Sequence, residues 1–397
     1  MTLATAATRL PLAARAVLAP LERLAYGRLR TVLPDGQHLD FGPGGPEAAL
    51  EVRDWRAFGR VVRGGDIGFA EGYLYGDWRT PDLARLLTLL AANRGALEAQ
   101  MRGSVLVGLL HRLRHALRAN TRRGSRRNIA AHYDLGNAFY ALWLDRGMTY
   151  SSALYGGDAT RPLEDAQRAK HERALARLAP RPAAQVLEIG SGWGAFAELA
   201  ARQGHRLTGI TLSREQLAWA SERVARAGLA SHARFELRDY RDVRERYDAV
   251  VSIEMYEAVG ESWWPDYFAR IASALPLGGR ALVQAIVIDD TLFERYRRGT
   301  DFIRHYIFPG GMLASHERLL AAARGARLEP VESFRFGGDY ALTLAAWRSR
   351  FLARQREVRA LGFDERFVRM WEFYLAYCEA GFLSRSTDVA QILLVKQ

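Results

Sequence analysis

Short apolar segments alternate with amphipathic helical segments along the C-terminal two thirds of the chain. Seven of them have the length and apolar content of buried strands, at 184–190, 205–211, 233–239, 247–253, 280–288, 328–334 and 390–396. Helical patterns separate these segments, as in a parallel sheet that carries helices on both faces and binds ligands at the carboxyl ends of its strands. The pattern predicts an α/β, Rossmann-like domain.

The N-terminal third has a different pattern. From about residue 30 to 93 it shows short polar-apolar segments, the turns "PDG" and "GPGG", and the apolar helical run "DLARLLTLLAAN". We interpret it as a smaller α+β domain. The predicted boundaries are 1–110 for this domain, 111–127 for a basic linker and 128–397 for the Rossmann-like domain.

The run "VLEIGSGWGAF" (186–196) joins a strand to a helix through three glycines. Glycine permits a tight turn and a close approach of the backbone to a ligand, so the run indicates a nucleotide-binding loop. The loop positions are Glu188, Gly190, Ser191, Gly192, Trp193 and Gly194. The pattern alone does not choose the nucleotide.

The next two strands distinguish the possible ligands. A dinucleotide-binding fold would place an acid at the end of the second strand, whereas this strand ends in "GITLSREQ" and offers Thr211, Ser213 and Gln216. The third strand ends with Asp239 and Tyr240, which suit an adenine amino group and ring. This set fits S-adenosylmethionine (SAM) better than NAD, so we predict a seven-stranded class I SAM-dependent methyltransferase domain; dinucleotide binding is the alternative.

Charge adds a second question. The 397 residues contain 56 Lys and Arg against 44 Asp and Glu, a net charge of +12, and seven arginines but no acid lie between Arg112 and Arg127. Such a run is a solvated linker face or a site for the phosphates of nucleic acid or anionic lipid. Composition leaves both interpretations open.

Cysteine content and hydropathy bear on location. The single cysteine, Cys378, cannot form an internal disulfide, which fits a reducing compartment such as the cytoplasm. No segment approaches the roughly 18 to 20 uncharged apolar residues that cross a bilayer. Arg9 and Arg15 interrupt the apolar N-terminal segment, which we interpret as an amphipathic packing helix, or else a helix on a membrane surface.

Several motifs together resemble one enzyme family. They are "HYDLGNAFYALWLD", "MTYSSALY", "VLEIGSGWG", "GITLSREQ", "RDYRD", "SIEMYEAVG", "YIFPGGMLAS" and "GGDYALTLAAW", in order from about residue 128 onward. The chain here resembles the cyclopropane fatty acid synthases and mycolic acid methyltransferases. The "PDG" and "GDIGFAEGY" segments are similar to the N-terminal domain of the full-length bacterial synthases, which implies a lipid- or membrane-associating domain.

The resemblance implies a set of site residues. Its cofactor positions correspond to Tyr150 and Ser151, to the loop from Glu188 to Gly194, and to the ends of the second and third strands. In the family a bicarbonate ion takes a proton, and the five positions that hold it read Ser152, Glu257, Gln284, Ile286 and Tyr340 here. Serine replaces a cysteine and Gln284 replaces a histidine. Serine supplies the same backbone amide as a cysteine, and Gln284 can donate hydrogen bonds as an imidazole does but cannot change protonation. The resemblance therefore implies bicarbonate as a possible cofactor, with two of its five positions substituted.

The implied chemistry is attack of an acyl-chain double bond on the sulfonium methyl, followed by proton loss from the carbocation. Glu257 is the strongest catalytic candidate because it follows the fourth strand; Glu254 lies nearby, and either acid could instead cap the next helix. Aromatic rings could stabilise the cation. The candidates are Tyr133, Phe139, Tyr150, Trp263, Tyr306 and Tyr340. We expect His132 to orient its own motif by hydrogen bonding.

These observations favour a cytoplasmic, peripherally membrane-associated enzyme that closes a cyclopropane ring on unsaturated phospholipid acyl chains. Methylation without ring closure is the alternative, because Gln284 could place the base differently. We expect Arg295, Arg297, Arg298 and Arg304 to lie near lipid phosphate or on a solvated helix. A nucleic-acid methyltransferase is disfavoured because no "NPPY"-type motif is present, and an inactive lipid-binding protein is disfavoured by the intact cofactor set. A homodimer is possible.

Overall fold

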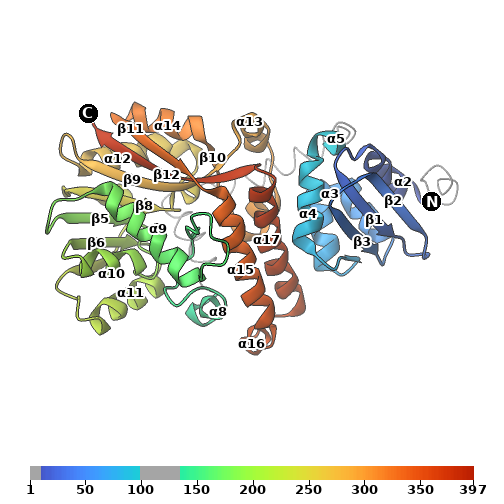
Figure 1. Ribbon diagram of the computed structural model, residues 1–397, viewed down its shortest axis with the longest axis horizontal. Coiled ribbons are helices and arrows are strands. Elements are labelled where there is room, and N and C mark those ends of the chain that lie inside the picture. The colour runs from blue at the N-terminus through green and yellow to red at the C-terminus, as the bar shows by residue number, and fades with distance from the viewer. Residues whose placement is uncertain (1–9, 99–134) are drawn as a thin grey trace. The chain divides into compact units, whose positions relative to one another are not determined.

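The structure is a computed structural model that describes residues 10–98 and 135–397. Its described residues divide into two units (Figure 1). The first contains 10–98, 298–307 and 351–386, and the second contains 135–297, 308–350 and 387–397. The predicted boundaries assign 298–307 and 351–386 to the Rossmann-like domain. Their contacts place them in the first unit instead, a grouping that linear order does not reveal.

The first unit has a four-stranded sheet in the order β2-β1-β3-β4, in which β1 and β3 are parallel. The strands are β1 (Gly27–Val32), β2 (His38–Gly44), β3 (Glu47–Val52) and β4 (Trp78–Arg79). Its helical elements are α2 (Leu12–Leu18), η1 (Ala19–Arg23), α3 (Arg56–Leu74), α4 (Leu83–Ala92), α5 (Arg94–Glu98), η5 (Ile303–Ile307), α16 (Gln355–Ala360) and α17 (Glu365–Leu383). Helix α17 packs on α3 and α4. The predicted α+β domain therefore receives a C-terminal helix.

The second unit has an eight-stranded sheet in the order β11-β12-β9-β8-β5-β6-β7, with β10 paired to β9. The strands are β5 (Gln185–Ile189), β6 (Arg206–Thr211), β7 (Ala233–Leu237), β8 (Ala249–Ile253), β9 (Arg280–Ile288), β10 (Ala314–Ser315), β11 (Leu328–Arg335) and β12 (Thr387–Lys396). All seven predicted strands are present. The additional strand, β10, has only two residues.

One feature of the sheet differs from the prediction. Strands β5 to β9 are parallel, but β12 runs antiparallel to both β9 and β11, so the sheet is mixed. Arg335, at the end of β11, pairs with Ala390 near the start of β12. Strand β12 therefore begins at the same end of the sheet at which β11 ends. Two antiparallel neighbours can be connected at one end, without a crossover connection over the face of the sheet.

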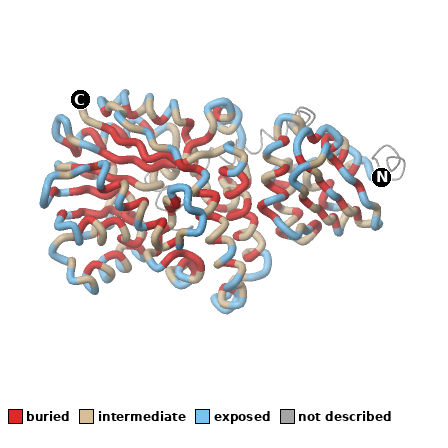
Figure 2. Tube along the Cα trace, viewed as in Figure 1, coloured by how far each residue is buried: buried red, intermediate tan, exposed pale blue. Residues whose placement is uncertain are grey.

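Helices cover both faces of this sheet (Figure 1). The helical elements of the unit are α8 (Asn137–Ala141), α9 (Leu163–Leu178), α10 (Ala195–Arg202), α11 (Arg214–Arg226), η2 (Tyr240–Asp242), η3 (Tyr256–Ala258), η4 (Glu261–Trp263), α12 (Trp264–Ala274), α13 (Asp290–Arg298), α14 (His316–Gly325) and α15 (Gly337–Ala353). Helices α9, α10 and α11 bury side chains against one face, and α12 and α14 bury theirs against the other. The central strands are buried along most of their length (Figure 2). This core fixes the carboxyl ends of β5 to β9, where the predicted site residues lie.

Candidate functional site

The loop after β5 forms a cradle that only glycine can line. Gly190 and Gly192 have φ angles of 84° and 51°, in the left-handed region that other residues avoid. A Cβ on Gly190 would lie 2.9 Å from the Cγ of Met255, whereas a Cβ on Gly192 would meet no atom of the described residues within 4 Å. Gly192 thus faces open space, which leaves room for a ligand against the backbone.

Two buried polar atoms beside this cradle have no hydrogen-bond partner among the described residues. They are Oε2 of Glu188 and Oγ of Ser191. Burial raises the pKa of Glu188 well above its usual value, and the charge of Lys170 opposes the rise. A cationic amino group bound here would both pair the carboxylate and offset its burial. The methionyl end of SAM carries such a group.

The ends of β6 and β7 are ordered by their own hydrogen bonds. Thr211 Oγ1 donates to Gln216 Oε1 at 2.9 Å, and Ser213 caps α11 by accepting from the backbone N–H of Gln216. After β7, Arg241 donates to both carboxylate oxygens of Asp239 at 2.9 and 2.6 Å. Each predicted cofactor residue on these strands is therefore held in a defined orientation.

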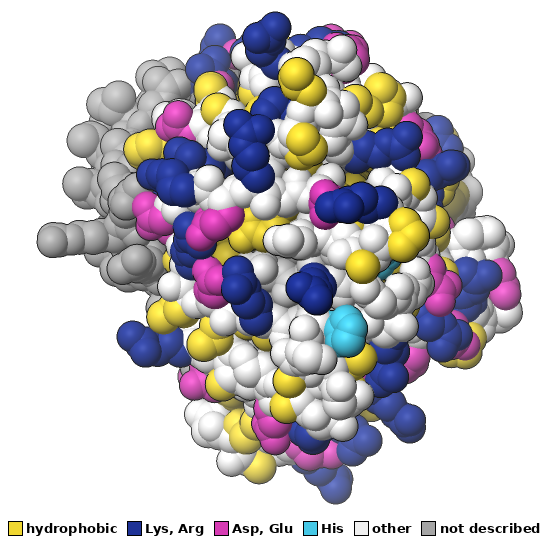
Figure 3. Space-filling view, turned by 90° about the vertical axis from the view of Figure 1, so that its left-hand side faces the viewer, with side chains coloured by type: hydrophobic (Ala, Val, Ile, Leu, Met, Phe, Trp, Pro, Cys, Tyr) yellow, Lys and Arg dark blue, Asp and Glu magenta, His cyan; other side chains and the backbone are white. Residues whose placement is uncertain are grey.

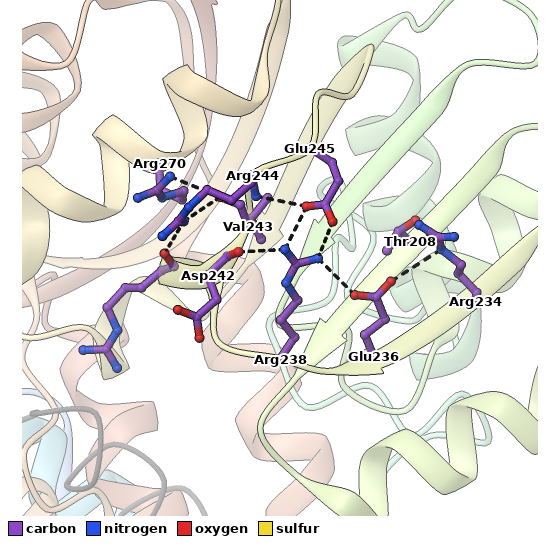
Figure 4. Close-up of polar contacts among 10 residues, drawn as sticks. Thr208, Arg234, Glu236, Arg238, Asp242, Val243, Arg244, Glu245 and Arg270 are labelled. Carbon is purple, nitrogen blue, oxygen red and sulfur yellow. Dashed lines mark hydrogen bonds and ion pairs between the residues drawn. The ribbon is translucent and has the colours of Figure 1, made fainter.

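A network of arginines stabilises the segment that carries Asp239 and Tyr240 (Figure 4). Arg238 donates to Glu245 through two bonds of 2.8 Å and to the backbone oxygen of Asp242 at 2.7 Å. These bonds hold the pKa of Glu245 at about 2, chiefly through the Arg238 guanidinium. The segment is anchored on the solvent side, so its inner side keeps a fixed shape.

Aromatic side chains pack around Tyr150, the first of the predicted cofactor positions. Its ring centroid lies 5.5 Å from that of Tyr140, 5.5 Å from Trp143 and 5.4 Å from Trp347. The ring of Tyr340 meets Trp347 at 6.1 Å. Two predicted site tyrosines therefore belong to one aromatic cluster, whose faces can stabilise a nearby cation.

The polar centre of the site is the carboxylate of Glu254, at the end of β8. Its Oε1 accepts from the Ser152 backbone N–H at 2.8 Å and from Gln284 Nε2 at 2.7 Å. Its Oε2 accepts from the Tyr340 hydroxyl at 2.6 Å. Three positions that the family resemblance assigns to a bound bicarbonate thus donate to a side-chain carboxylate instead.

A chain of amides orients Gln284. Arg173 Nη1 donates to Gln391 Oε1 at 2.5 Å, and Gln391 Nε2 donates to Gln284 Oε1 at 3.0 Å. Because the Gln284 oxygen accepts from Gln391, its NH₂ group points to Glu254. The orientation of this amide is thus set from α9 and β12.

Glu257 and Ile286 complete the predicted set but bond to each other. Ile286 N donates to Glu257 Oε1 at 2.5 Å, while Oε2 is buried without a hydrogen-bond partner among the described residues. Burial, with the neighbouring charge of Glu254, raises the pKa of Glu257 to about 8. Burial also raises the pKa of Glu254, against the opposing effects of Lys170 and Tyr340. Of the two acids, Glu254 has the charge-stabilising partners, because Lys170 and its hydrogen-bond donors oppose the rise in its pKa.

Neither acid caps the following helix, so the capping alternative is wrong for both. The short helix η3 has Met255 at its N-cap and no side-chain cap. Glu254 has a φ of 50°, a strained conformation for a non-glycine residue. That backbone turns the carboxylate toward the donors of the neighbouring segments.

Some predicted residues lie away from this centre. Tyr306 belongs to the first unit, where its hydroxyl donates to Glu71 at 2.7 Å. Arg304 is 3% exposed and donates to the Gly299 carbonyl, so it is not at a surface for lipid phosphate. Trp263 lies beneath the Arg241 guanidinium. His132, Tyr133 and the basic linker fall outside the described residues.

Sequence reasoning missed three polar residues of the site: Arg173, Gln391 and Lys170. Gln391 occupies a buried position within the apolar strand segment 390–396, and Lys170 lies on the inner face of α9. A single polar residue on an otherwise apolar face is a sequence signal for a buried polar contact. The sequence pattern does not show which other buried group that residue contacts.

Fold and site together define the class of protein. Orphaned atoms at Glu188 and Ser191, the open space at Gly192 and the ordered ends of β6 and β7 fit SAM, whose sulfonium supplies an electrophilic methyl group. The protein is a SAM-dependent methyltransferase. The described residues contain no group of His, Cys, Asp and Glu arranged to hold a metal ion.

Comparison with known proteins identifies the family. The sequence model of mycolic acid cyclopropane synthetase matches residues 120–392. The tuberculostearic acid methyltransferase of Mycobacterium tuberculosis is 40% identical over 347 residues, 85% of this chain and 81% of the relative. The cyclopropane-fatty-acyl-phospholipid synthase of Escherichia coli K12 is 33% identical over 359 residues, 88% of each chain. The chain belongs to the mycolic acid cyclopropane synthetase family and is a methyltransferase of the cyclopropane synthase type that acts on lipid chains.

Solved structures agree with this assignment. A cyclopropane synthase from Mycobacterium tuberculosis is 29% identical, with a TM-score of 0.64 over 68% of this chain and 98% of that chain. A mycolic acid cyclopropane synthase complexed with SAH and CTAB matches with the same values. The prediction of the family and of the class I methyltransferase fold is confirmed.

Surface charge and helix hydropathy add two observations. On the face shown in Figure 3, arginines lie among acidic and uncharged side chains rather than in one continuous stripe. Within residues 10–98 and 135–397, no helix is long and apolar enough to cross a membrane.

Proposed function

We propose that the protein transfers a methyl group from SAM to the double bond of an unsaturated acyl chain in a membrane phospholipid and leaves an open-chain, methyl-branched product. The carbocation formed on the acyl chain loses its proton to Glu254. The single observation that carries the proposal is the set of three donors on the Glu254 carboxylate.

Glu254 suits the role of proton acceptor by position and charge. It is a strong acceptor held by Ser152, Gln284 and Tyr340, so it needs no reorganisation when the cation forms. A bound bicarbonate would require the same three donors and would lie against a negative side chain. We therefore infer that the protein carries its own base and does not require bicarbonate.

The electron balance is simple. The alkene π pair forms a new C–C bond to the methyl carbon as the C–S bond breaks, which leaves the second alkene carbon positively charged. The aromatic cluster around Tyr150 and Tyr340 can stabilise that charge by about 0.5–2 kcal/mol per ring face. The electron pair of a C–H bond next to the cation then becomes the π pair of a new C=C bond, and the proton goes to Glu254.

Which C–H bond breaks decides the product. Loss of a proton from the added methyl can close a cyclopropane ring, whereas loss from a chain carbon, or loss after a hydride shift, gives an open methyl-branched alkene. In the proposed mechanism the base is a side chain fixed to the backbone after β8, in place of a bound ion. The 40% identical relative is named a methyltransferase rather than a cyclopropane synthase. Both observations favour the open chain, and ring closure is the second candidate.

The test uses the purified full chain, SAM with a deuterated methyl group and vesicles of monounsaturated phospholipid in buffer stripped of bicarbonate. We expect labelled, methyl-branched fatty acids, identified by mass spectrometry and NMR, with no increase in rate when bicarbonate is added. Cyclopropane proton signals in the product would overturn the open-chain proposal. Dependence on bicarbonate would overturn the role of Glu254, and label absent from lipid would overturn the acceptor class.

A further inference from the structure

Lys170 is an unusual residue in this chain. Of the 56 Lys and Arg residues, only Lys170 and Lys396 are lysine. Lys170, on α9, is 0% exposed. Lysine is almost never fully buried without a partner, since burial of an ammonium is costly. Nearly all other basic residues of the chain are arginine, whereas position 170 has the compact ammonium group of lysine.

The side chain of Lys170 holds the loop that contacts Glu254. Its Nζ donates to Ser151 Oγ at 2.6 Å, and Gln167, one turn earlier on α9, donates to the Ser151 carbonyl oxygen at 2.8 Å. The next backbone N–H, that of Ser152, donates to Glu254. One face of α9 therefore positions a donor of the proposed base.

The backbone of Lys170 reaches the same centre by a second route. Its carbonyl oxygen accepts from Gln391 Nε2 at 3.3 Å, and that amide also donates to Gln284. Gln284 in turn donates to Glu254. Two of the three donors of Glu254 are thus connected to one residue of α9.

The groups facing the ammonium come from four elements. Glu254 follows β8, Glu188 lies on β5, Asp145 follows α8, and all three act on Lys170 by their charge. His171, its neighbour on α9, has a pKa lowered well below the usual value by burial, so it stays neutral. Burial lowers the pKa of Lys170 to about 8. Lys170 remains the cation of this group at neutral pH.

The geometry points to Lys170 as a positioning residue of the reaction: its charge keeps Glu254 ionised, and its contacts hold the Ser152 and Gln284 donors in place. The assignment rests on the proposed role of Glu254. Among the described residues, no cation acts on Glu257, the other carboxyl group beside Glu254, and its pKa is raised to about 8.

The test compares the full-length K170M, K170R and K396M variants with the wild type in single-turnover methyl transfer from pH 5.5 to 9. We expect K170M to lose about 100-fold in rate at pH 7. The acid limb of the pH–rate profile of K170M should shift to higher pH by about one unit or more, because removal of the cation raises the pKa of Glu254. Affinity for SAM should change less than the rate. K170R should keep the wild-type limb at a reduced rate.

Lys396 supplies the matched control. Lys396 lies at the end of β12, and its Nζ donates to the carbonyl oxygen of Leu275, the residue after α12. K396M therefore removes the same charge away from the site and should leave the pH–rate profile unchanged. An acid limb of K170M that coincides with the wild type would overturn the inference. If K170M does not fold, the K170R variant tests the inference. It keeps the positive charge, so a shift of the acid limb of its pH–rate profile would contradict the electrostatic role of Lys170. Absence of lipid methylation by the wild type itself would reject the proposed function instead.

Discussion

The cofactor cradle and the proposed proton-acceptor site lie at the same edge of one sheet but are built in opposite ways. Within the described part of the chain, the cradle leaves buried oxygens of Glu188 and Ser191 unpaired and leaves open space at Gly192. The acceptor site instead gives the Glu254 carboxylate three donors. The cradle thus offers oxygens to a ligand, whereas Glu254 has its donors within the protein; beside it, Oε2 of Glu257 is buried without a partner among the described residues.

This difference follows from the chemistry of each half. A cofactor must bind and leave in every cycle, so groups such as Glu188 and Ser191 stay available to it, whereas Thr211 and Asp239 are oriented by hydrogen bonds of their own. A base must present an ionised carboxylate at a fixed point when the cation forms, and preorganised donors achieve this without movement. Substitutions in the acceptor site should therefore change rate, and those in the cradle should change affinity.

The largest effect is expected from Glu254→Ala. Loss of a positioned base typically costs 10²–10⁴ in rate, so the single-turnover rate should fall about 1000-fold while affinity for SAM, measured by calorimetry, changes only a few fold. Formate or bicarbonate should restore part of the rate in this variant and not in the wild type. A rate within tenfold of the wild type would show that the proton goes elsewhere.

Gly192→Val should act on binding. A valine at a φ of 51° is strained, and its side chain would occupy the open space of the cradle, so affinity for S-adenosylhomocysteine should fall about 10- to 100-fold. Gly228→Val is the matched control, because Gly228 also has a positive φ, 70°, and open space but follows the far end of α11. Equal losses in both variants would mean that the effect is general strain.

Gln391→Leu should affect rate moderately. It removes the amide that orients Gln284, and loss of one such hydrogen bond is equivalent to about tenfold in single-turnover rate. Affinity for SAM should be unchanged. Gln185→Leu, at the exposed start of β5, is the control. A fall in SAM affinity as large as the fall in rate would mean that Gln391 supports the cofactor cradle instead of Glu254.

Glu257→Gln should change the pH dependence of stability. The carboxyl titrates near 4.5 when unfolded and near 8 when folded, so between these pH values the native state binds the extra proton. The free energy of unfolding therefore falls as pH rises through this window. Glutamine removes the dependence, and apo E257Q should exceed the wild type in Tm by roughly 10 °C at pH 8 and by less at pH 5. Parallel Tm curves would contradict the raised pKa.

Local pattern predicted most of the fold. Strand periodicity and the glycine loop identified seven strands and the cofactor end of the sheet, because both signals lie in consecutive residues. The antiparallel direction of β12 was missed, since periodicity carries no direction. The grouping of α17 with the N-terminal sheet was missed because it depends on contacts between segments far apart in sequence.

The site was predicted as a list of positions rather than as a network. Ser152, Gln284 and Tyr340 were identified, and the structure brings them together, but around Glu254, which had been ranked below Glu257. Motif matching compares each position of this sequence with one position of the family, independently of its neighbours in space. It cannot show that the acid at position 254 lies between three donors that come from different segments.

The position of β12 has a consequence for biosynthesis. Ribosomes make chains from the N-terminus, so this strand emerges after every other strand of its sheet, yet it lies between β9 and β11 and carries Gln391. Until it arrives, both neighbours present an unpaired edge that invites aggregation. A nascent or prematurely terminated chain would thus need protection by a chaperone, and it could not assemble the support for Gln284.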